Sequence, residues 1–370
     1  MANHEKRAFV SILIPCRNEE KFVENCLKSV LSFKGLEIID YEVLVIDGMS
    51  IDHTKEIIQT IITQFPASEI NIIDNPKKIQ SAALNIGINR AKGDFILRLD
   101  AHSVYPQDYL IKLLETSLHT NADNVGGIIN TYPFDNSYSA RLVQALTTHK
   151  FGVGNSGFRV GAKEGLVDTV PYGFFRKEIF KKVGFFDERL VRAQDYEFNC
   201  RIRASGGKVW INPAIQLQYF NQPDLYSFLK KTFIWEAPFN AYMWYLAPYT
   251  FNLRHSITAL FTSGVLIGGC LSLLSKYVFI AYTFIIAIYF FLAIISSIQQ
   301  AFRFRNIFHI FTLPFSFFLF HSLHGAGILF GSFMLLIKQS PVQRSKFAWG
   351  NTILMRYNKQ VIDNFSSNKS

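Results

Sequence analysis

Two residues that can bind a cation, Asp100 and His102, follow directly after an apolar stretch of the chain. The stretch Asp94–Leu99 is rich in residues that favour β-structure, which predicts a buried strand. Positions two apart in an extended backbone project to the same side, so we expect the carboxylate and the imidazole to point together. Ligands of open α/β sheets collect beyond the carboxyl ends of the strands. The pair predicts a site for Mn²⁺ or Mg²⁺, against the alternative of a solvated turn.

Other carboxylates lie at the predicted ends of strands and helices. Asp47 follows a strand over Tyr41–Ile46, where it either accepts hydrogen bonds from a nucleotide or belongs to a turn. Asp195 is expected at the start of a helix, where the helix dipole favours its ionised form. Glu197 precedes Arg201 by four residues, which predicts a surface ion pair. Asp195 and Glu197 fall on opposite faces of that helix and cannot both face one substrate.

Strands and helices alternate along the N-terminal part of the chain and would position these side chains. We expect strands at Phe9–Pro15, Tyr41–Ile46, Glu69–Ile73 and Asp94–Leu99. Helical spacing of apolar residues predicts helices over Glu20–Phe33 and Ile79–Ala91, and a further helix that Asp52 can cap. This alternation calls for a parallel sheet with right-handed crossovers. The sequence has neither a Gly-x-Gly-x-x-Gly after the first strand nor a usable P-loop.

Three motifs follow one another between residues 9 and 220. They are residues 10–19 (VSILIPCRNE), 45–54 (VIDGMSIDHT) and 99–102 (LDAH). In combination they resemble the motifs of family-2 inverting glycosyltransferases of the GT-A fold. Membrane-anchored bacterial exopolysaccharide enzymes of the succinoglycan type carry a similar Asp-Ala-His. The resemblance implies a Rossmann-like, mostly parallel α/β domain.

The resemblance also implies roles for single positions. The residues near the nucleotide would be Pro15, Asn18, Glu19, Asp47, Asn85 and Asp100. Asp100 and His102 would hold Mn²⁺ or Mg²⁺ on the diphosphate, and Asp195 would be the catalytic base. Two positions depart from the family: Gln194 occupies a common Glu position, and Leu84 an Arg position. Gln194 and Trp235 would contact the acceptor.

These roles imply a hexosyltransferase acting in bacterial polysaccharide biosynthesis. It would move one sugar from a nucleoside diphosphate sugar, expected to be a UDP-sugar, to a hydroxyl of a lipid-linked saccharide. A cation stabilises the charge that develops on the departing diphosphate, and a base takes the proton of the attacking hydroxyl. Two alternatives stay open. One is a polyprenyl-phosphate sugar synthase, whose acceptor is the lipid phosphate, and the other is a non-catalytic, nucleotide-sensing subunit of a membrane transport or assembly system.

The C-terminal third of the chain has the composition of a membrane region. The runs Ser256–Ser275 and Tyr277–Ile298 carry no formal charge, and each can cross a hydrocarbon core of about 30 Å. A third run, Ile307–Ile337, is interrupted by Pro and Gly, so it is open whether it crosses once, re-enters or forms a hairpin. Residues 251–370 contain ten Lys and Arg against Asp363 alone. We interpret this charge as a membrane-binding signal and expect no nucleic-acid partner.

Several residues near the membrane have two open interpretations. His321 and His324 share a helix face, where they either contact a lipid diphosphate or hydrogen-bond to other helices beside a Gly327-x-x-x-Gly331 packing face. Trp235 is either an interfacial anchor or an acceptor contact. The Gln-x-x-Arg-Trp motif of processive polymer synthases is replaced by TFIW at residues 232–235, which argues against processive elongation.

The sequence predicts four segments. They are a catalytic domain over 1–225, an amphipathic interfacial segment over 226–252, transmembrane helices over 253–340 and a basic tail over 341–370. The four cysteines have no framework spacing, which predicts free thiols in a reducing compartment. No signal-peptide pattern opens the chain. We expect a multi-pass protein of the bacterial inner membrane with its catalytic domain on the cytoplasmic side.

Overall fold

The computed structural model describes residues 7–344, which form two compact units. The first unit contains residues 7–130 and 161–219, and the second contains residues 131–160 and 220–344. The second unit therefore includes a segment from the middle of the region predicted as the catalytic domain. The predicted division of the chain near residues 225, 252 and 340 stays a prediction. Most of the predicted basic tail, from residue 345 on, lies outside the described residues.

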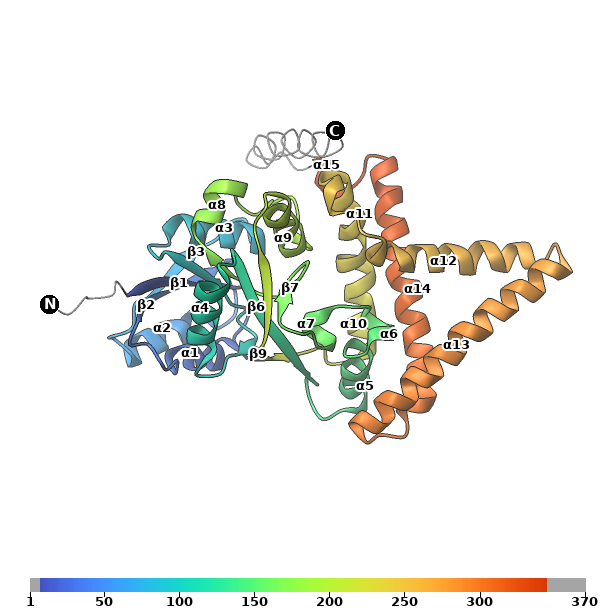
Figure 1. Ribbon diagram of the computed structural model, residues 1–370, viewed down its shortest axis with the longest axis horizontal. Helices are drawn as coiled ribbons and strands as arrows, with labels where there is room; N and C mark the ends of the chain where they lie inside the picture. Colours follow the sequence, from blue (N-terminus) through green and yellow to red (C-terminus); the bar gives the residue numbers. More distant parts are fainter. Residues whose placement is uncertain (1–6, 345–370) are drawn as a thin grey trace. The chain divides into compact units, whose positions relative to one another are not determined.

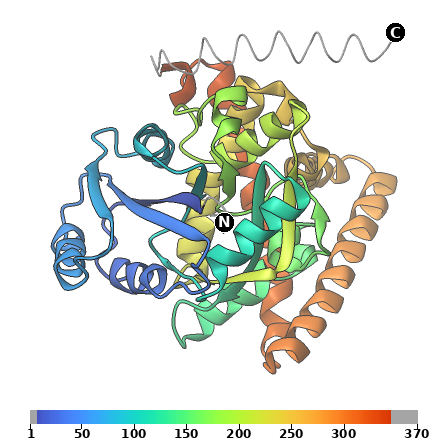
Figure 2. The ribbon, with the colours of Figure 1, turned by 60° about the vertical axis from the view of Figure 1, so that its left-hand side comes forward.

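The first unit is built on a sheet whose first half is parallel, as predicted. Its strands are β1 (Ala8–Cys16), β2 (Ile39–Asp47), β3 (Ile70–Asp74) and β4 (Phe95–Arg98). They run side by side in the order β3-β2-β1-β4, and all three pairings are parallel (Figure 2). The centre of β1 is buried at consecutive positions, from Val10 to Ile14. Both faces of this half are therefore covered, as is usual for parallel sheets.

The second half of the sheet is antiparallel, which the sequence analysis did not predict. It contains β8 (Phe174–Arg176), β6 (Asn124–Tyr132), β9 (Val209–Phe220) and β5 (Ser103–Val104), with the short β7 (Gly165–Leu166) paired to β9. β8 lies against β4, with Phe174 opposite Leu97. Several of these strands are too short to show a period in the sequence. The result is the expected α/β fold with a mixed sheet.

Helices pack on this sheet and fix the loops at the strand ends. They are α1 (Val23–Leu31), α2 (Thr54–Gln64), α3 (Gln80–Arg90), α4 (Tyr109–Thr120), α8 (Glu178–Val183) and α9 (Gln194–Ala204). α3 approaches β1 and β2 closely, because a Cβ on Gly87 would lie 2.9 Å from Leu13 and 3.0 Å from Ile46. Only glycine leaves room for this contact, so α3 is fixed against the parallel strands.

The second unit is helical (Figure 1). Its helices are α5 (Tyr138–Thr147), α6 (Lys150–Val153), α7 (Gly157–Val160), α10 (Leu225–Lys231), the π-helix η1 (Thr232–Glu236), α11 (Ala237–Leu246), the 3₁₀ helix η2 (Pro248–Thr250), α12 (Leu253–Ser272), α13 (Lys276–Phe304), α14 (His309–Leu336) and α15 (Pro341–Arg344). The segment predicted as amphipathic and interfacial, 226–252, is thus largely helical.

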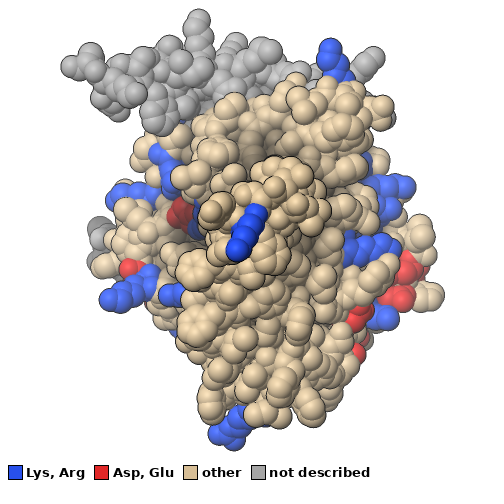
Figure 3. All heavy atoms as spheres, turned by 90° about the vertical axis from the view of Figure 1, so that its right-hand side faces the viewer, with Lys and Arg blue, Asp and Glu red and all other residues tan. Residues whose placement is uncertain are grey.

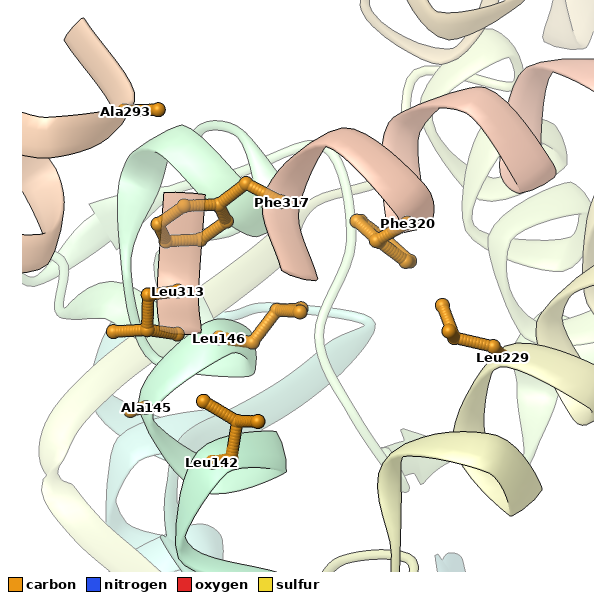
Figure 4. Close-up of a cluster of buried hydrophobic side chains, with 8 residues drawn as sticks. All are labelled: Leu142, Ala145, Leu146, Leu229, Ala293, Leu313, Phe317 and Phe320. Carbon is orange, nitrogen blue, oxygen red and sulfur yellow. The ribbon is translucent and has the colours of Figure 1, made fainter. Parts of the chain in front are cut away.

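A buried hydrophobic cluster joins residues 131–160 to the C-terminal helices (Figure 4). Its members are Leu142, Ala145, Leu146, Leu229, Ala293, Leu313, Phe317 and Phe320, from α5, α10, α13 and α14. Polar contacts reinforce the cluster. Gln300 donates to the Ala145 carbonyl and, at 3.1 Å, to Thr148 Oγ1, and Arg303 donates to the Thr148 carbonyl at 3.1 Å. The segment 131–160 is therefore an integral part of the helical unit.

Within residues 7–344, three helices, α12, α13 and α14, are long and apolar enough to cross a membrane. The first two correspond to the predicted charge-free runs. Many of their apolar side chains are exposed, among them Leu266, Ile267 and Phe284. In Figure 3 the centre and lower part of the drawn face carry only isolated charged side chains. The third run forms one continuous helix that contains Pro314, so it is not a hairpin.

The two histidines of α14 hydrogen-bond within the helical unit. His321 Nδ1 lies 2.8 Å from the Tyr289 hydroxyl, and its Nε2 lies 3.1 Å from the Gly152 carbonyl oxygen. His324 Nδ1 lies 2.7 Å from Thr258 Oγ1. These bonds agree with the interhelical interpretation, because protein groups already occupy both ring nitrogens of His321.

Gly327 and Gly331 form the predicted packing face on α14. A Cβ on Gly327 would lie 2.7 Å from the Ala237 Cβ and 2.9 Å from the Phe233 carbonyl oxygen. A Cβ on Gly331 would lie 2.7 Å from the Pro238 carbonyl oxygen. Small residues are needed because the backbones approach closely, as is typical of helix packing in membranes. The packing partners are η1 and α11, which precede the apolar helices in the chain.

Candidate active site

The candidate site lies where β1, β2 and β4 end. β1 pairs with both other strands, so that Cys16 is opposite Asp47 and Leu13 is opposite Arg98. The loops that follow these strands therefore begin side by side. Asp100 follows β4 by two residues. The parallel strand order thus brings the three sequence motifs to one edge of the sheet, where ligands of α/β folds bind.

Asp100 is contacted by three side chains, two at its carboxylate and one at its backbone N–H. Arg98 Nη2 lies 3.3 Å from Asp100 Oδ1, and Gln80 Nε2 donates to the same oxygen at 3.2 Å. The backbone N–H of Asp100 donates to the Tyr105 hydroxyl at 2.9 Å. The Asp100 side chain keeps 14 % exposure. Its carboxylate is therefore oriented by the protein and still partly open to solvent.

Asp195 lies at the second position of α9, as predicted, and meets the same arginine. Its Oδ2 is 3.5 Å from Arg98 Nη1, and its Oδ1 accepts from the Tyr196 N–H at 3.1 Å. The side chain is 42 % exposed. A partly exposed carboxylate in the first turn of a helix can be reached by a bound group and accept its proton.

Arg98 links the two carboxylates and was not identified from the sequence. Its side chain is 6 % exposed, and the Tyr172 ring lies 5.9 Å from its guanidinium carbon. Burial alone would lower the pKa of Arg98, but the negative charges of Asp100 and Asp195 outweigh burial and raise it. The arginine therefore remains charged. The available signal was an arginine inside an otherwise apolar strand, since buried arginines need partners.

Gln194 and Gln80 form a second connection to Asp100. Gln194 is buried, and its Nε2 donates to Gln80 Oε1 at 2.7 Å, while Gln80 donates to Asp100 as described above. Gln194 had been predicted to contact the acceptor. The structure places it at the first position of α9 with its side chain buried, and a contact with the acceptor stays a prediction.

His102 points to the β1 loop. Its Nδ1 lies 3.2 Å from Glu19 Oε1, and the imidazole is 36 % exposed. The Tyr219 ring packs edge-on against it, with centroids 6.0 Å apart. A carboxylate on one ring nitrogen fixes the orientation of an imidazole. Glu19, predicted near the nucleotide, thus belongs to the surroundings of His102.

The residues present fit a cation that shares its ligands with a substrate. Over residues 7–344 no group of three or more His, Cys, Asp or Glu could hold a metal ion alone. Asp100 and His102 offer one oxygen and one nitrogen ligand, and Glu19 supports the imidazole. Mg²⁺ in nucleotide enzymes is commonly held by one or two carboxylates plus substrate phosphates, so two protein ligands are sufficient.

Asp47 is fully buried and holds a turn. Its Oδ2 accepts from the Ser50 N–H at 3.0 Å and lies 3.3 Å from Lys55 Nζ. The Ser50 hydroxyl in turn contacts the Asn18 N–H at 2.9 Å, and Asn18 Oδ1 accepts from the Ile51 N–H at 3.0 Å. The turn interpretation therefore holds. Asp47 and Asn18 tie the β2 loop to the β1 loop, and their contacts with a nucleotide stay predictions.

Asn85 serves the fold and not the open site. Its Nδ2 donates to the Phe186 carbonyl at 2.9 Å and to Glu188 at 3.1 Å, and its Oδ1 accepts from the Phe186 N–H at 3.0 Å. The residue is buried on α3. Because its amide is occupied by the segment that precedes α9, we do not expect it to contact a nucleotide directly. Pro15 lies at the end of β1 and is partly exposed.

The Glu197–Arg201 ion pair is buried, and the expected surface pair is therefore a wrong prediction. Glu197 Oε1 accepts from Arg201 Nε at 2.6 Å, and the two side chains are 0 % and 1 % exposed. The Arg201 guanidinium also donates to the Val183 and Phe185 carbonyls at 2.8 Å. A spacing of four residues predicts the pairing but not the environment. This pair anchors α9, which carries Asp195.

Trp235 lies in the helical unit. It is part of η1 and is 53 % exposed, and the neighbouring Lys231 and Glu236 form an ion pair of 3.3 Å. π-helical turns are rare and are frequent at functional sites. Whether Trp235 contacts an acceptor or anchors the chain at a membrane interface stays a prediction.

Comparison with known proteins gives a consistent set of relatives. The family model "Glycosyl transferase family 2" matches residues 11–184, which include the three motifs except Val10, but not Asp195. The dolichyl N-acetyl-alpha-D-glucosaminyl phosphate 3-beta-D-2,3-diacetamido-2,3-dideoxy-beta-D-glucuronosyltransferase of Methanococcus voltae is 32 % identical over 89 % of this chain and 98 % of its own length. The succinoglycan biosynthesis protein ExoA of Rhizobium meliloti is 32 % identical over 58 % of this chain and 64 % of its own length.

Solved structures are more distant. The mannosyltransferase PcManGT from Pyrobaculum calidifontis, in complex with GDP-Man and Mn²⁺, has 16 % identity and a TM-score of 0.47 over 64 % of this chain and 63 % of its own. S. aureus TarS 1–349 in complex with UDP-GlcNAc has 15 % identity and a TM-score of 0.44 over 58 % of both chains.

Proposed function

The chain belongs to glycosyl transferase family 2 and is a glycosyltransferase, and from this premise we propose that it transfers one sugar, with inversion, from a nucleoside diphosphate sugar to a hydroxyl of a lipid-linked saccharide. The observation that carries the proposal is the shared contact of Asp100 and Asp195 with Arg98. It supports a single reaction centre in which one carboxylate serves the diphosphate and the other serves the acceptor.

In the proposed reaction, the acceptor oxygen attacks the anomeric carbon of the sugar, and the bond from that carbon to the diphosphate breaks. The electron pair of the broken bond leaves with the diphosphate. Asp195 takes the proton of the attacking hydroxyl, a role that its partly exposed carboxylate suits. A single displacement of this kind inverts the configuration at the anomeric carbon. The non-processive character proposed from residues 232–235 agrees with the addition of one sugar.

Asp100 and His102 are the residues that would hold a divalent cation, Mn²⁺ or Mg²⁺. When bound, such an ion stabilises negative charge on the departing diphosphate and orients it. Gln80 and Arg98 orient the Asp100 carboxylate, and Glu19 orients the His102 imidazole. The loops joined by Asn18 and Ser50 are proposed to receive the base and ribose of the donor, which we expect to be a UDP-sugar.

The proposed acceptor and location rest on the relatives and on the apolar helices. The Methanococcus voltae relative, which matches 89 % of this chain and 98 % of its own length, is named as a transferase of dolichyl N-acetyl-alpha-D-glucosaminyl phosphate. The ExoA relative acts in succinoglycan biosynthesis. Three helices can cross a membrane. These facts support a multi-pass membrane protein of polysaccharide biosynthesis, which we place in the bacterial inner membrane with its catalytic unit on the cytoplasmic side.

The direct test is a screen of nucleotide sugars against membranes that contain the full-length protein, with Mn²⁺ and lipid extract as acceptor. Transfer of radiolabel from one donor to the lipid fraction is expected, and none with Asp195→Asn. A product formed on bare polyprenyl phosphate would instead show a polyprenyl-phosphate sugar synthase. No transfer or donor hydrolysis with any nucleotide sugar would contradict the proposal and favour a nucleotide-sensing subunit.

A further inference from the structure

The strand that precedes Asp100 and the helix α9, whose second residue is Asp195, are joined by side chains that do not themselves react. Arg98 contacts both carboxylates, with Nη2 at 3.3 Å from Asp100 and Nη1 at 3.5 Å from Asp195. In parallel, Gln194 donates to Gln80, and Gln80 donates to Asp100. The two connections meet at the same oxygen, Asp100 Oδ1.

The start of α9 is held in an unfavourable backbone conformation. Ala193, immediately before Gln194, has φ +63°, and Tyr172, whose ring lies over Arg98, has φ +62°. Residues other than glycine are disfavoured in the left-handed region and persist there only where their surroundings enforce it. The first turns of α9, which follow Ala193, are held by the buried ion pair of Glu197 and Arg201 and by the Gln194–Gln80 bond.

We propose that Arg98, together with the Gln80–Gln194 amide pair, is a positioning device that sets the separation between Asp100 and Asp195. This inference rests on the proposed function, because it assigns the two carboxylates to the two ends of one reacting sugar. A guanidinium is suited to the task, since it is planar and offers donors on two edges. Lysine keeps the charge but offers one nitrogen on a flexible stem, so it cannot contact the two carboxylates through two separate nitrogens of a rigid plane.

The amide pair explains why Gln and not Glu precedes Asp195. A carboxylate at position 194 would accept but not donate, and it would be buried facing the Gln80 oxygen. Gln194 supplies the donor that lets Gln80 turn its own amide N–H to Asp100. Gln194, which stands where the family resemblance implies Glu, therefore has its hydrogen-bond partner in Gln80 on α3.

The test compares Arg98→Lys, Gln80→Ala and the double variant with wild-type full-length protein in detergent. Misplacement of a reacting group by about 1 Å costs ~10²-fold in rate. We expect kcat of sugar transfer to fall by roughly that factor in Arg98→Lys. KM for the donor and Mn²⁺-dependent UDP binding, measured by calorimetry, should stay within about threefold. In the double variant, the factor by which kcat falls should be smaller than the product of the two single factors. Both changes alter the same separation, that between Asp100 and Asp195, so their effects are not additive.

Arg176→Lys is the matched control. Arg176 also lies in the sheet, in β8, and its guanidinium packs on the Phe95 ring. Its guanidinium donates to the Ala122 and Ser117 carbonyls, whereas that of Arg98 contacts two carboxylates. Equal losses of kcat in the two lysine variants would overturn the inference. So would parallel losses of UDP binding and thermal stability in Arg98→Lys, which mark a merely structural role. An inactive wild type would overturn the proposed function, and this inference with it.

Discussion

Asp100 and Asp195 contact two nitrogens of the buried Arg98 guanidinium. Asp100 follows strand β4, whereas Asp195 is the second residue of helix α9, far along the chain. The distances are 3.3 Å to Arg98 Nη2 and 3.5 Å to Arg98 Nη1. Had the two carboxylates lain in separate parts of the first unit, they could not act on one sugar. Their common partner makes a shared reaction centre the simplest explanation of both residues.

The base assignment is tested by Asp195→Asn. The amide keeps the size and a hydrogen-bonding oxygen but cannot take a proton, so transfer should fall by about 10²–10⁴-fold. Mn²⁺-dependent UDP binding should stay close to wild type, as measured by calorimetry. Asp108→Asn, which alters a half-exposed carboxylate paired with Lys112 in the same unit, is the control and should keep full activity. Full turnover in Asp195→Asn would remove the assignment.

The proposed cation site is tested by Asp100→Ala and by Glu19→Gln. Loss of the oxygen ligand should abolish the dependence of UDP binding on Mn²⁺. Glu19 only supports the His102 imidazole, and loss of such support typically weakens metal affinity about 10–100-fold. Titrations of UDP with and without Mn²⁺ measure both effects, and Glu24→Gln on the exposed face of α1 serves as the control. Mn²⁺-dependent binding that survives in Asp100→Ala would place the ion elsewhere.

Two ion pairs with the same spacing should differ widely in their effect on stability. Glu197→Gln leaves Arg201 buried without its counter-charge, which we expect to lower the free energy of unfolding by about 3–5 kcal/mol. Glu24→Gln breaks the half-exposed pair with Lys28 and should cost less than about 0.5 kcal/mol. Denaturant unfolding of the two full-length variants makes the comparison. Equal effects would contradict the burial of Glu197.

The loop after β2 should lose stability in acid. Burial alone would raise the pKa of Asp52, but hydrogen bonds from the Thr54 hydroxyl and amide and from the Glu20 amide lower it below its ordinary value of 3.8. A lowered pKa in the folded state means that the carboxylate stabilises the fold above pH 3.8. That stabilisation disappears as the pH falls through the lower value of the folded state.

The measurement is the difference in unfolding free energy between wild type and Asp52→Asn at a series of pH values. The difference should be constant near neutral pH and should shrink below about pH 4. A difference that grows toward acid pH would show that Asp52 is not stabilised in its ionised form.

The sequence alone determined the elements with long, regular patterns. The parallel strands β1–β4 and the apolar helices α12 and α13 were predicted because apolar periodicity and uncharged length are properties of the local chain. The motifs at the strand ends determined the family. The short antiparallel strands β5, β7 and β8 have no such pattern, so they appeared only in the structure.

The tertiary structure alone decided which polar residues are buried and what they contact. Arg98, Gln80 and Gln194 look ordinary in the sequence, and Glu197–Arg201 looks like any exposed pair of the same spacing. Their environments depend on which elements pack above them, and spacing along one element carries no information on that packing. For the same physical reason, the segment 131–160 showed its membership of the helical unit only through contacts such as that of Gln300 with Ala145.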